Sequence, residues 1–241
     1  MEYELNLLHL YPDLLNLYGD KGNIASLEKR LTWRGIRANI TVCTAENNTP
    51  DFAHADIVFF GGGSDREEEE VVKLLSEKRD ELRNYVENGG VLLATCGGFP
   101  MLGNYFYTAS GKVDGLGVLD IATEAEKDRC IGDIILESEL VPQPVCGFVN
   151  YAGNTQIGAL KPFGKIIGGA TGKSGCDGVI YKNVIATYLH GPLLPKNPML
   201  CDYILTAALK QKYPDFTGLS PLDDSMETVA NQYIIDRFIT K

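Results

Sequence analysis

One of the 6 cysteines, Cys96, stands where an apolar strand would end and a tight turn would begin. The run Val91 to Thr95 leads directly into it, and Gly97, Gly98 and a short helical pattern follow. A sharp strand-to-helix turn lifts such a side chain out of the sheet, and small neighbours leave room around it. A helix N-terminus behind the thiol would lower its pKa from about 8.5 toward neutrality. The pattern predicts a nucleophile, with a buried structural cysteine as the alternative.

A thiolate nucleophile usually works with a histidine, and the chain has 3 histidines. His190 follows the strand-like run Val184 to Leu189 and precedes a Gly-Pro pair. Active sites of open α/β sheets lie at the carboxyl ends of strands, where both Cys96 and His190 are expected. His190 is therefore the expected base, whereas His9 and His54 are interpreted as satisfied core residues.

Two glycine-rich segments invite different interpretations. The first, Gly61 to Gly63, follows an apolar run, and its bare backbone N–H groups could bind an anion or an oxyanion. Glycine is also common in turns for conformational reasons alone. The second, Gly168 to Ser174, resembles a phosphate-binding loop, but its spacing is one residue too short and no helical pattern follows. We expect no nucleotide site there.

Composition narrows the possible functions. The chain has 241 residues and a formal net charge of −10, which argues against binding to a phosphate backbone. No apolar run reaches the roughly 18 residues of a membrane span, and the N-terminus lacks a basic signal start. The cysteines lie far apart and form no C-x-x-C pair. We expect a reduced, cytoplasmic protein without a structural metal site, a nucleic-acid partner or membrane insertion.

The elements that would position these residues alternate in the first half of the chain. Short apolar runs predict buried strands, and helical spacing of apolar residues predicts helices between them. The second half predicts shorter, partly antiparallel strands and two further helices. The expected fold is α/β, a flavodoxin-like, open, mostly parallel sheet with helices on both faces, in one domain over residues 1–241 with a C-terminal tail or helix from about 213. The expected strands are 5–10, 56–60, 91–95, 116–121, 130–136, 164–167, 179–181 and 184–188, and the expected helices are 22–34, 67–88, 198–212 and 227–239.

Taken together, these residues resemble the class I, triad-type glutamine amidotransferases, in their cobyric-acid-synthase-like branch. Within that branch, three segments resemble the GatD family, the glutaminase subunits of lipid II isoglutaminyl synthases. The segments are Tyr18 to Asn23, Gly61 to Arg66 and Thr187 to Pro198. The resemblance covers roughly residues 5 to 205.

The resemblance implies a separate role for each of these residues. Cys96 would attack the side-chain amide of L-glutamine, giving a γ-glutamyl thioester and ammonia. His190 would protonate the leaving ammonia and then activate the hydrolytic water. Backbone N–H groups of Gly62 or Gly63 and of Gly97 would hold the oxyanion. No cofactor is implied.

The resemblance also assigns Arg129 to the glutamine α-carboxylate, a natural task for a planar guanidinium, although a surface arginine on a strand is the alternative. The chain departs from the family at four positions. Pro192 stands where ordinary triad enzymes have a glutamate, and the branch as a whole also lacks that glutamate. Ser64 replaces a glutamine, and Val149 and Tyr151 replace a glutamate and a histidine. We expect altered contacts beside the pocket and an intact nucleophile.

The implied partner is a separate Mur-ligase-like subunit of the MurT type, in a heterodimer. That subunit would use ATP to activate D-glutamate in the lipid II stem peptide, and the ammonia would amidate it during peptidoglycan synthesis. Because no acid follows His190, we hypothesise that the partner also supplies the group that orients this histidine. The alternatives are a stand-alone thiol hydrolase or peptidase of the same fold, and a non-catalytic binding subunit with an inert Cys96.

Overall fold

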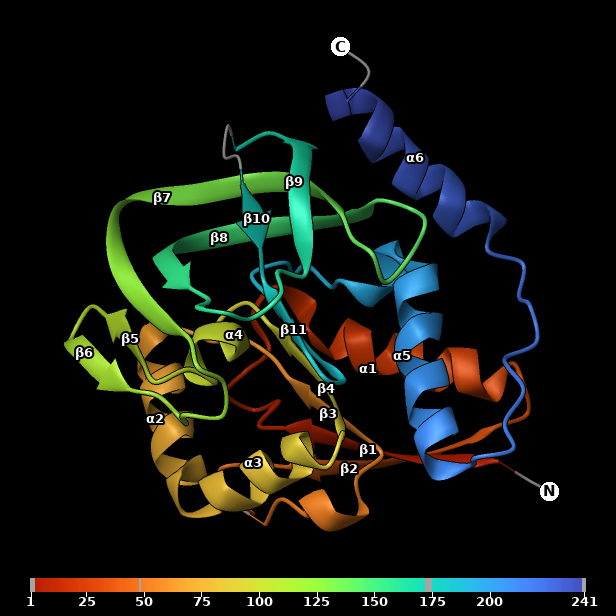
Figure 1. The fold of residues 1–241 in the computed structure, drawn as a ribbon, viewed down its shortest axis with the longest axis horizontal. Coiled ribbons are helices and arrows are strands. Elements are labelled where there is room, and N and C mark those ends of the chain that lie inside the picture. The colour runs from red at the N-terminus through yellow and green to blue at the C-terminus, as the bar shows by residue number, and fades with distance from the viewer. Residues whose placement is uncertain (1–2, 48, 172–174, 240–241) are drawn as a thin grey trace.

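The computed structural model describes residues 3–47, 49–171 and 175–239. The end of the glycine-rich segment Gly168 to Ser174 therefore lies outside the described residues. Two sheets dominate the fold, and the helices lie around the first of them except for the C-terminal helix, which lies beside the second (Figure 1). One hydrophobic core contains residues from both sheets, such as Leu8 from the first and Ile134 from the second.

The first sheet has the strand order β11-β12-β4-β3-β1-β2. Its neighbours pair in parallel except for β11 and β12, which are antiparallel. Every residue of β3 and β4 is buried, as expected of central strands covered on both faces. The strands are β1 (Glu4–Leu10), β2 (Arg37–Cys43), β3 (Ile57–Phe60), β4 (Val91–Thr95), β11 (Val179–Tyr181) and β12 (Val184–Thr187).

Helices connect these strands as the alternating pattern predicts. Helices α1 and α5 pack against each other, and α2 and α3 lie apart from them in Figure 1. The mostly parallel α/β arrangement predicted for the first half is thereby confirmed. The helices are α1 (Lys21–Thr32), α2 (Asp65–Leu75), α3 (Arg79–Glu87), the single turn α4 (Gly98–Met101) and α5 (Pro198–Lys212).

The second sheet is built around a long antiparallel ribbon that crosses the upper part of Figure 1. Its strand order is β10-β9-β7-β5-β6, and β8 pairs with β7 along most of the length of β7. The pairing of β7 with β8 is irregular between Ala125 and Cys130. The strands are β5 (Tyr105–Thr108), β6 (Gly111–Asp114), β7 (Ala122–Glu137), β8 (Val145–Gln156), β9 (Gly164–Gly169) and β10 (Cys176–Asp177).

Two predicted elements are wrong. The helix expected over 67–88 is divided into α2 and α3 by the short turn Ser76–Lys78, where the Ser76 hydroxyl donates to the Lys73 carbonyl at 2.7 Å. The strand expected over 116–121 is a buried loop. Its backbone N–H groups bond to the turn after α4 instead of to a strand, as in Leu116 to the Met101 carbonyl at 2.8 Å.

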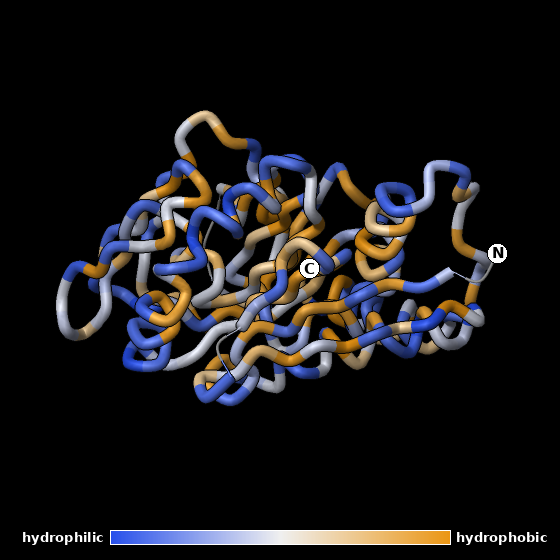
Figure 2. The backbone as a smooth tube through the Cα atoms, turned by 90° about the horizontal axis from the view of Figure 1, so that it is seen from below, coloured by the Kyte–Doolittle hydropathy of each residue, from blue (hydrophilic) through white to orange (hydrophobic). Residues whose placement is uncertain are grey.

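The C-terminal helix α6 (Ser225–Ile239) packs on the second sheet. Ile235 contacts Ile135 and Cys146, and the Asn231 amide donates to the Lys196 carbonyl at 3.0 Å. Hydrophobic segments run along the inner strands, whereas hydrophilic segments lie mostly at the periphery (Figure 2). Among the described residues, no helix is both long and apolar enough to cross a membrane.

Candidate active site

Cys96 occupies a strained turn at the end of β4. Its φ of 53° lies in the left-handed region that residues other than glycine seldom adopt. The Cys96 N–H donates to the Thr187 carbonyl at 2.9 Å, which ties the end of β4 to the end of β12. A Cβ atom on Gly98 would lie 2.5 Å from the Phe60 carbonyl oxygen, so only glycine fits there. These features are those of a nucleophile elbow, as the sequence predicts.

His190 lies beyond the end of the neighbouring strand and is fully buried. Its backbone N–H donates to the Phe148 carbonyl of β8 at 2.9 Å. The imidazole stacks on the Tyr18 ring, with centroids 4.3 Å apart and an angle of 15°. Burial and the nearby Lys196 ammonium lower its pKa to about 4, so the ring is neutral at pH 7.

Neither ring nitrogen of His190 has a hydrogen-bond partner among the described residues. The Cys96 thiol is therefore not bonded to the imidazole here, although both groups stand at the same edge of the sheet. A neutral imidazole without an orienting acceptor can take up a proton, but nothing within the described chain fixes which nitrogen carries one.

A cavity of about 300 Å³ opens beside the Cys96 thiol, between the first sheet and the β7–β8 ribbon. This volume is at the lower end of the range for small-molecule sites. His190 does not line the cavity, whereas Tyr18, which stacks on it, does. Other lining residues are Glu68, Gly63, Gly97, Arg129, Tyr151 and Tyr188.

The three glycines predicted for the oxyanion lie around Cys96, but their N–H groups have partners. The Gly62 N–H donates to the Asp20 carboxylate at 2.9 Å. The Gly63 N–H bonds to the Glu68 carboxylate, and the Gly97 N–H bonds to the Cys96 sulfur. Burial raises the pKa of Asp20 to about 7, and the bond from Gly62 partly offsets that shift.

The prediction of an acidified thiol is wrong for this structure, because the pKa of Cys96 is raised. Burial is the largest cause, followed by the Glu68 and Asp20 carboxyl groups; the Gly97 N–H and Arg129 oppose them more weakly. The helix behind the thiol has only 4 residues, too few to build a strong N-terminal field. Proton transfer to a neighbouring base is therefore needed to form thiolate.

Glu68 lies directly over the nucleophile, and a side chain at Gly97 would collide with its carboxyl group. Burial, and then the nearby Asp65, raise the pKa of Glu68 to about 8. Its carboxyl group is thus mostly protonated at pH 7, in contact with one of the N–H groups expected to hold an oxyanion.

Arg129 lies on β7 beside the irregular stretch and faces the same cavity. Its Nε donates to the Asn150 side-chain oxygen at 2.5 Å, and the Asn150 amide nitrogen donates to the Tyr18 hydroxyl. The Arg129 side chain belongs to an exposed residue and so remains accessible to a ligand carboxylate.

The positions that depart from the family have local explanations. The Ser64 N–H donates to the Glu67 carboxylate at 2.7 Å, as part of the capping box that begins α2. Val149 is fully buried in the core, and Tyr151 stacks on Tyr188 with centroids 3.9 Å apart. Pro192 packs against Gly22, where a Cβ atom would lie 2.5 Å from the proline Cγ.

The other histidines lie away from the cavity. His9 is buried in β1 with its ring 5.3 Å from that of Phe59. His54 is exposed, and its Nδ1 lies 2.7 Å from the Asp51 carboxylate. The prediction of a satisfied core histidine is therefore wrong for His54, which is exposed, and the buried His9 Nε2 has no hydrogen-bond partner among the described residues.

Four residues of the site were not predicted from the sequence: Tyr18, Asp20, Glu68 and Asn150. The first two belong to the segment Tyr18 to Asn23, whose resemblance to the family was the available signal. Glu68 lies in an acidic run that is typical of a solvated helix start, and its burial depends on contacts from distant segments. Asn150 carries no local signal of its role.

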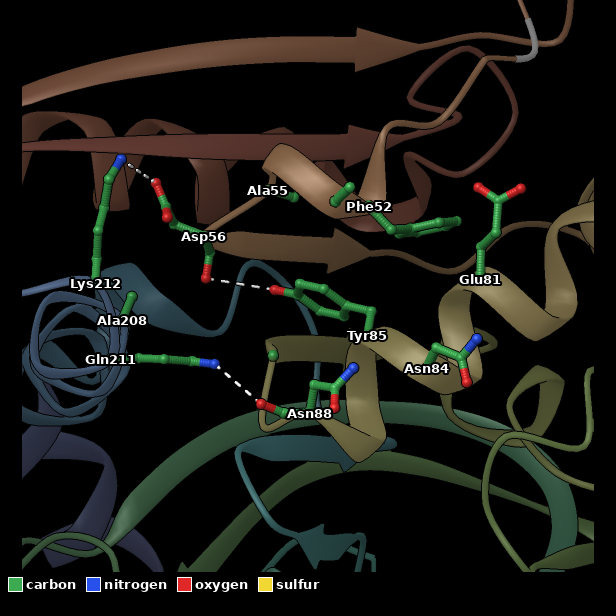
Figure 3. Close-up of a pocket in the computed structure, with 12 residues that line it drawn as sticks. Phe52, Ala55, Asp56, Glu81, Asn84, Tyr85, Asn88, Ala208, Gln211 and Lys212 are labelled. Atoms are coloured by element: carbon green, nitrogen blue, oxygen red, sulfur yellow. Dashed lines mark hydrogen bonds and ion pairs between the residues drawn. The ribbon is translucent and has the colours of Figure 1, made fainter.

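A larger cavity of about 480 Å³ lies at the opposite end of the first sheet (Figure 3). There Tyr85 donates its hydroxyl to the Asp56 carbonyl, and Lys212 forms an ion pair with the Asp56 carboxylate at 2.8 Å. Neither Cys96 nor Arg129 lines this cavity, so it is separate from the elbow.

The site combines a cysteine at a strained elbow, a buried histidine beyond the adjacent strand and an exposed arginine that lines the same cavity as the cysteine. This arrangement is of the type that a thiol-dependent amide hydrolase uses. Residues 6–198 match the CobB/CobQ-like glutamine amidotransferase domain, and the chain belongs to that family. A crystal structure of a glutamine amidotransferase shares the fold, with a TM-score of 0.50 and 20% identity, over 83% of this chain and 98% of that one.

Two relatives match nearly the whole chain. The GatD subunit of lipid II isoglutaminyl synthase (glutamine-hydrolyzing) from Streptococcus pneumoniae is 39% identical over 238 residues, covering 96% of this chain and 91% of that protein. The GatD subunit from Staphylococcus aureus is 39% identical over 240 residues, covering 98% and 96%. Cobyric acid synthase from Brucella abortus is 33% identical over 118 residues, which cover 46% of this chain and 24% of that protein.

Proposed function

We propose that this protein is the glutamine-hydrolysing subunit of a lipid II isoglutaminyl synthase. The observation that carries the proposal is the strained Cys96 elbow beside His190, in a chain that is 39% identical to two such subunits over nearly its full length. The match to the glutamine amidotransferase domain supports the same class of reaction.

The chemistry follows from the protonation states. Neutral His190 takes the proton from the Cys96 thiol, and the sulfur attacks the side-chain amide carbon of L-glutamine. The oxyanion that forms binds the N–H groups of Gly63 and Gly97, which requires the Glu68 carboxyl group to move aside. The imidazolium then gives its proton to the departing ammonia, leaving a γ-glutamyl thioester. Water, deprotonated by neutral His190, hydrolyses the thioester to glutamate and restores the thiol.

Arg129 binds the α-carboxylate of glutamine in this scheme. A guanidinium forms two parallel hydrogen bonds with a carboxylate, and Asn150 holds one edge of it through the 2.5 Å contact at Nε. The other edge is available to the ligand. Arg129 and Cys96 line one cavity, so a single amino acid can reach both.

The partner we propose is an ATP-dependent, Mur-ligase-like subunit of the MurT type. It would activate the α-carboxyl group of D-glutamate in the lipid II stem peptide, and the ammonia would form D-isoglutamine. The unpartnered nitrogens of His190 and the proline at position 192 support a further role, in which the partner supplies the group that orients the imidazole. Bound partner would then raise the rate of hydrolysis.

The test measures ammonia and glutamate released from L-glutamine by the purified chain, with and without the co-expressed ligase subunit. Release that depends on Cys96 and rises with the partner is expected, and Cys96→Ala serves as the blank. Equal rates with and without the partner would contradict its proposed role at His190. Hydrolysis of other amides or peptides without any partner would favour a stand-alone thiol hydrolase. No release in either state, together with an unlabelled Cys96 after treatment with a glutamine-analogue electrophile, would favour a binding subunit.

A further inference from the structure

Tyr18 has a backbone conformation that needs support from its surroundings. It lies in the short 3₁₀ turn η1 (Leu17–Gly19) with a φ of 57° and a ψ of 25°, the left-handed region that bulky residues avoid. Gly19, with a φ of 79°, follows it. Such strain persists only where tertiary contacts fix it, and it is often found at functional sites. Tyr18 has two such contacts, one with His190 and one that leads through Asn150 to Arg129.

The first contact is with His190. The Tyr18 ring stacks on the imidazole, while Phe148 of β8 meets the imidazole edge-on at 5.4 Å. Tyr18 itself is 43% exposed and lines the cavity, whereas His190 is fully buried. The tyrosine ring thus lies between the cavity and the imidazole.

The second contact is with the carboxylate-binding side of the cavity. Asn150 accepts a hydrogen bond from Arg129 through its oxygen and donates one to the Tyr18 hydroxyl through its nitrogen. The Asn150 side-chain amide uses both its oxygen and its nitrogen, so the orientations of Arg129 and of the Tyr18 hydroxyl depend on each other. The guanidinium of Arg129 is therefore connected to the plane of the His190 imidazole through Asn150 and Tyr18.

We infer that Tyr18 is a positioning residue that couples binding of the glutamine α-carboxylate at Arg129 to the placement of His190; this inference rests on the proposed function. A carboxylate bound to Arg129 fixes the guanidinium, and through Asn150 it fixes the Tyr18 hydroxyl. The ring then holds the imidazole in one plane. A substrate that lacks the α-carboxylate would not fix the guanidinium, so the Tyr18 hydroxyl and the imidazole would not be held in place.

The charges around the imidazole permit a pH readout. The His190 ring faces Tyr18 of η1 and Phe148 of β8, and Cys96 lies at the end of the adjacent strand. Besides burial, the charge that lowers the pKa of the imidazole is Lys196 of the 3₁₀ turn η4 (Leu194–Lys196). Burial lowers the pKa of His190 to about 4. Loss of the Tyr18 ring would admit water and raise that pKa toward the ordinary value of about 6.5.

The experiment uses the complex with the ligase subunit and measures kcat and KM for glutamine from pH 3.5 to pH 9, a range that includes the acid limb set by His190. Tyr18→Phe keeps the stacked ring and loses the hydroxyl, and Asn150→Ala breaks the same connection from its other end. We expect both variants to raise KM about 3- to 10-fold, the loss expected from one hydrogen bond, with kcat changed less than about twofold. Tyr18→Leu removes the stack as well. We expect kcat to fall about tenfold and the acid limb of kcat/KM to move to higher pH by about one unit.

Tyr181 provides matched controls, because its hydroxyl donates to the Glu87 carboxylate at 3.0 Å beside the other end of β12. Tyr181→Phe and Tyr181→Leu should leave KM, kcat and the acid limb unchanged. If the wild-type complex is active and the Tyr18→Phe and Asn150→Ala variants keep its KM, the inference is overturned while the proposed function stands. This comparison decides the question even if Tyr18→Leu fails to fold. If the wild-type complex releases no more ammonia than Cys96→Ala, both are overturned.

Discussion

The Cys96 thiol is surrounded by groups that oppose its ionisation. Burial and the carboxyl groups of Glu68 and Asp20 raise its pKa, and only the Gly97 N–H and the more distant Arg129 act in the other direction. The carboxyl group of Glu68 also contacts the Gly63 N–H, where an oxyanion would bind. The free chain is therefore held in a state with a protonated nucleophile and an occupied oxyanion site. Glu68 is the residue whose change should reveal this most directly.

We predict that Glu68→Gln increases the rate at which Cys96 is alkylated at alkaline pH. Above about pH 8 the wild-type carboxyl group is ionised and holds the pKa of the thiol up, whereas the amide carries no charge. At pH 9 we expect the iodoacetamide reaction of Cys96, followed by peptide mass spectrometry, to be about tenfold faster in the variant. Glu70→Gln, an exposed position on the same helix, is the control. Equal rates in Glu68→Gln and wild type would show that Glu68 does not control the thiol.

At the scale of elements, one buried side chain joins the parts that surround His190. Asn197, at the start of α5, accepts from the Cys146 N–H of β8 at 2.9 Å and donates to the Cys146 carbonyl at 2.8 Å. It also donates to the Leu193 carbonyl at 2.7 Å and lies 3.3 Å from the Asn231 amide of α6. The segment between β12 and α5, which contains His190, is thereby fastened to the second sheet.

Asn197→Ala should therefore be strongly destabilising. The substitution leaves a buried N–H and two buried carbonyl groups without their partner, and we expect the free energy of unfolding to fall by about 2–4 kcal/mol. Urea denaturation followed by circular dichroism measures the change. Asn84→Ala, an exposed position on α3, should change the free energy of unfolding by less than about 0.5 kcal/mol. A loss of similar size in both variants would refute the fastening role of Asn197.

At the scale of the whole molecule, a buried arginine attaches the C-terminal segment to the first half of the chain. Arg30 of α1 forms ion pairs with Asp202 of α5 at 2.7 Å and with Asp224, just before α6, at 2.6 Å. The Arg30 side chain is only 4% exposed, so these carboxylates balance a charge that water cannot reach. The tail from residue 213 is thus part of the folded molecule, and α6 packs across β8, β7 and β9 of the second sheet.

Asp224→Asn should loosen this attachment. Arg30 keeps Asp202 but loses one of its two balancing charges, so we expect the free energy of unfolding to fall by about 1–3 kcal/mol. Limited proteolysis within residues 213–224 should become several times faster, because local opening of the segment costs less. Asp215→Asn, an exposed position in the same segment, is the matched control. Cleavage that is unchanged in Asp224→Asn would show that α6 is held by its apolar contacts alone.

Sequence patterns predicted those elements whose signals are local. Apolar runs predicted β1, β3, β4 and β12, because a strand covered on both faces consists mostly of apolar residues. They missed β2, an edge strand in which polar and apolar residues alternate and most residues are exposed or half-buried. They also missed β8, which pairs with β7. The 67–88 helix was predicted without its break, because apolar spacing continues through the turn at Ser76.

The sequence by itself determined the elbow at Cys96, the position of His190 after a strand-like run and the α/β class, since each depends on residues close together in the chain. The tertiary structure placed that strand, β12, beside β4. The tertiary structure decided the raised pKa of the thiol, because burial and the carboxyl groups of Asp20 and Glu68 act only once distant segments fold around it. It also decided the contacts that run from Arg129 through Asn150 to Tyr18 and His190, which join four separate segments. Local patterns specify which side chains are present, but electrostatics and stacking depend on distances through space.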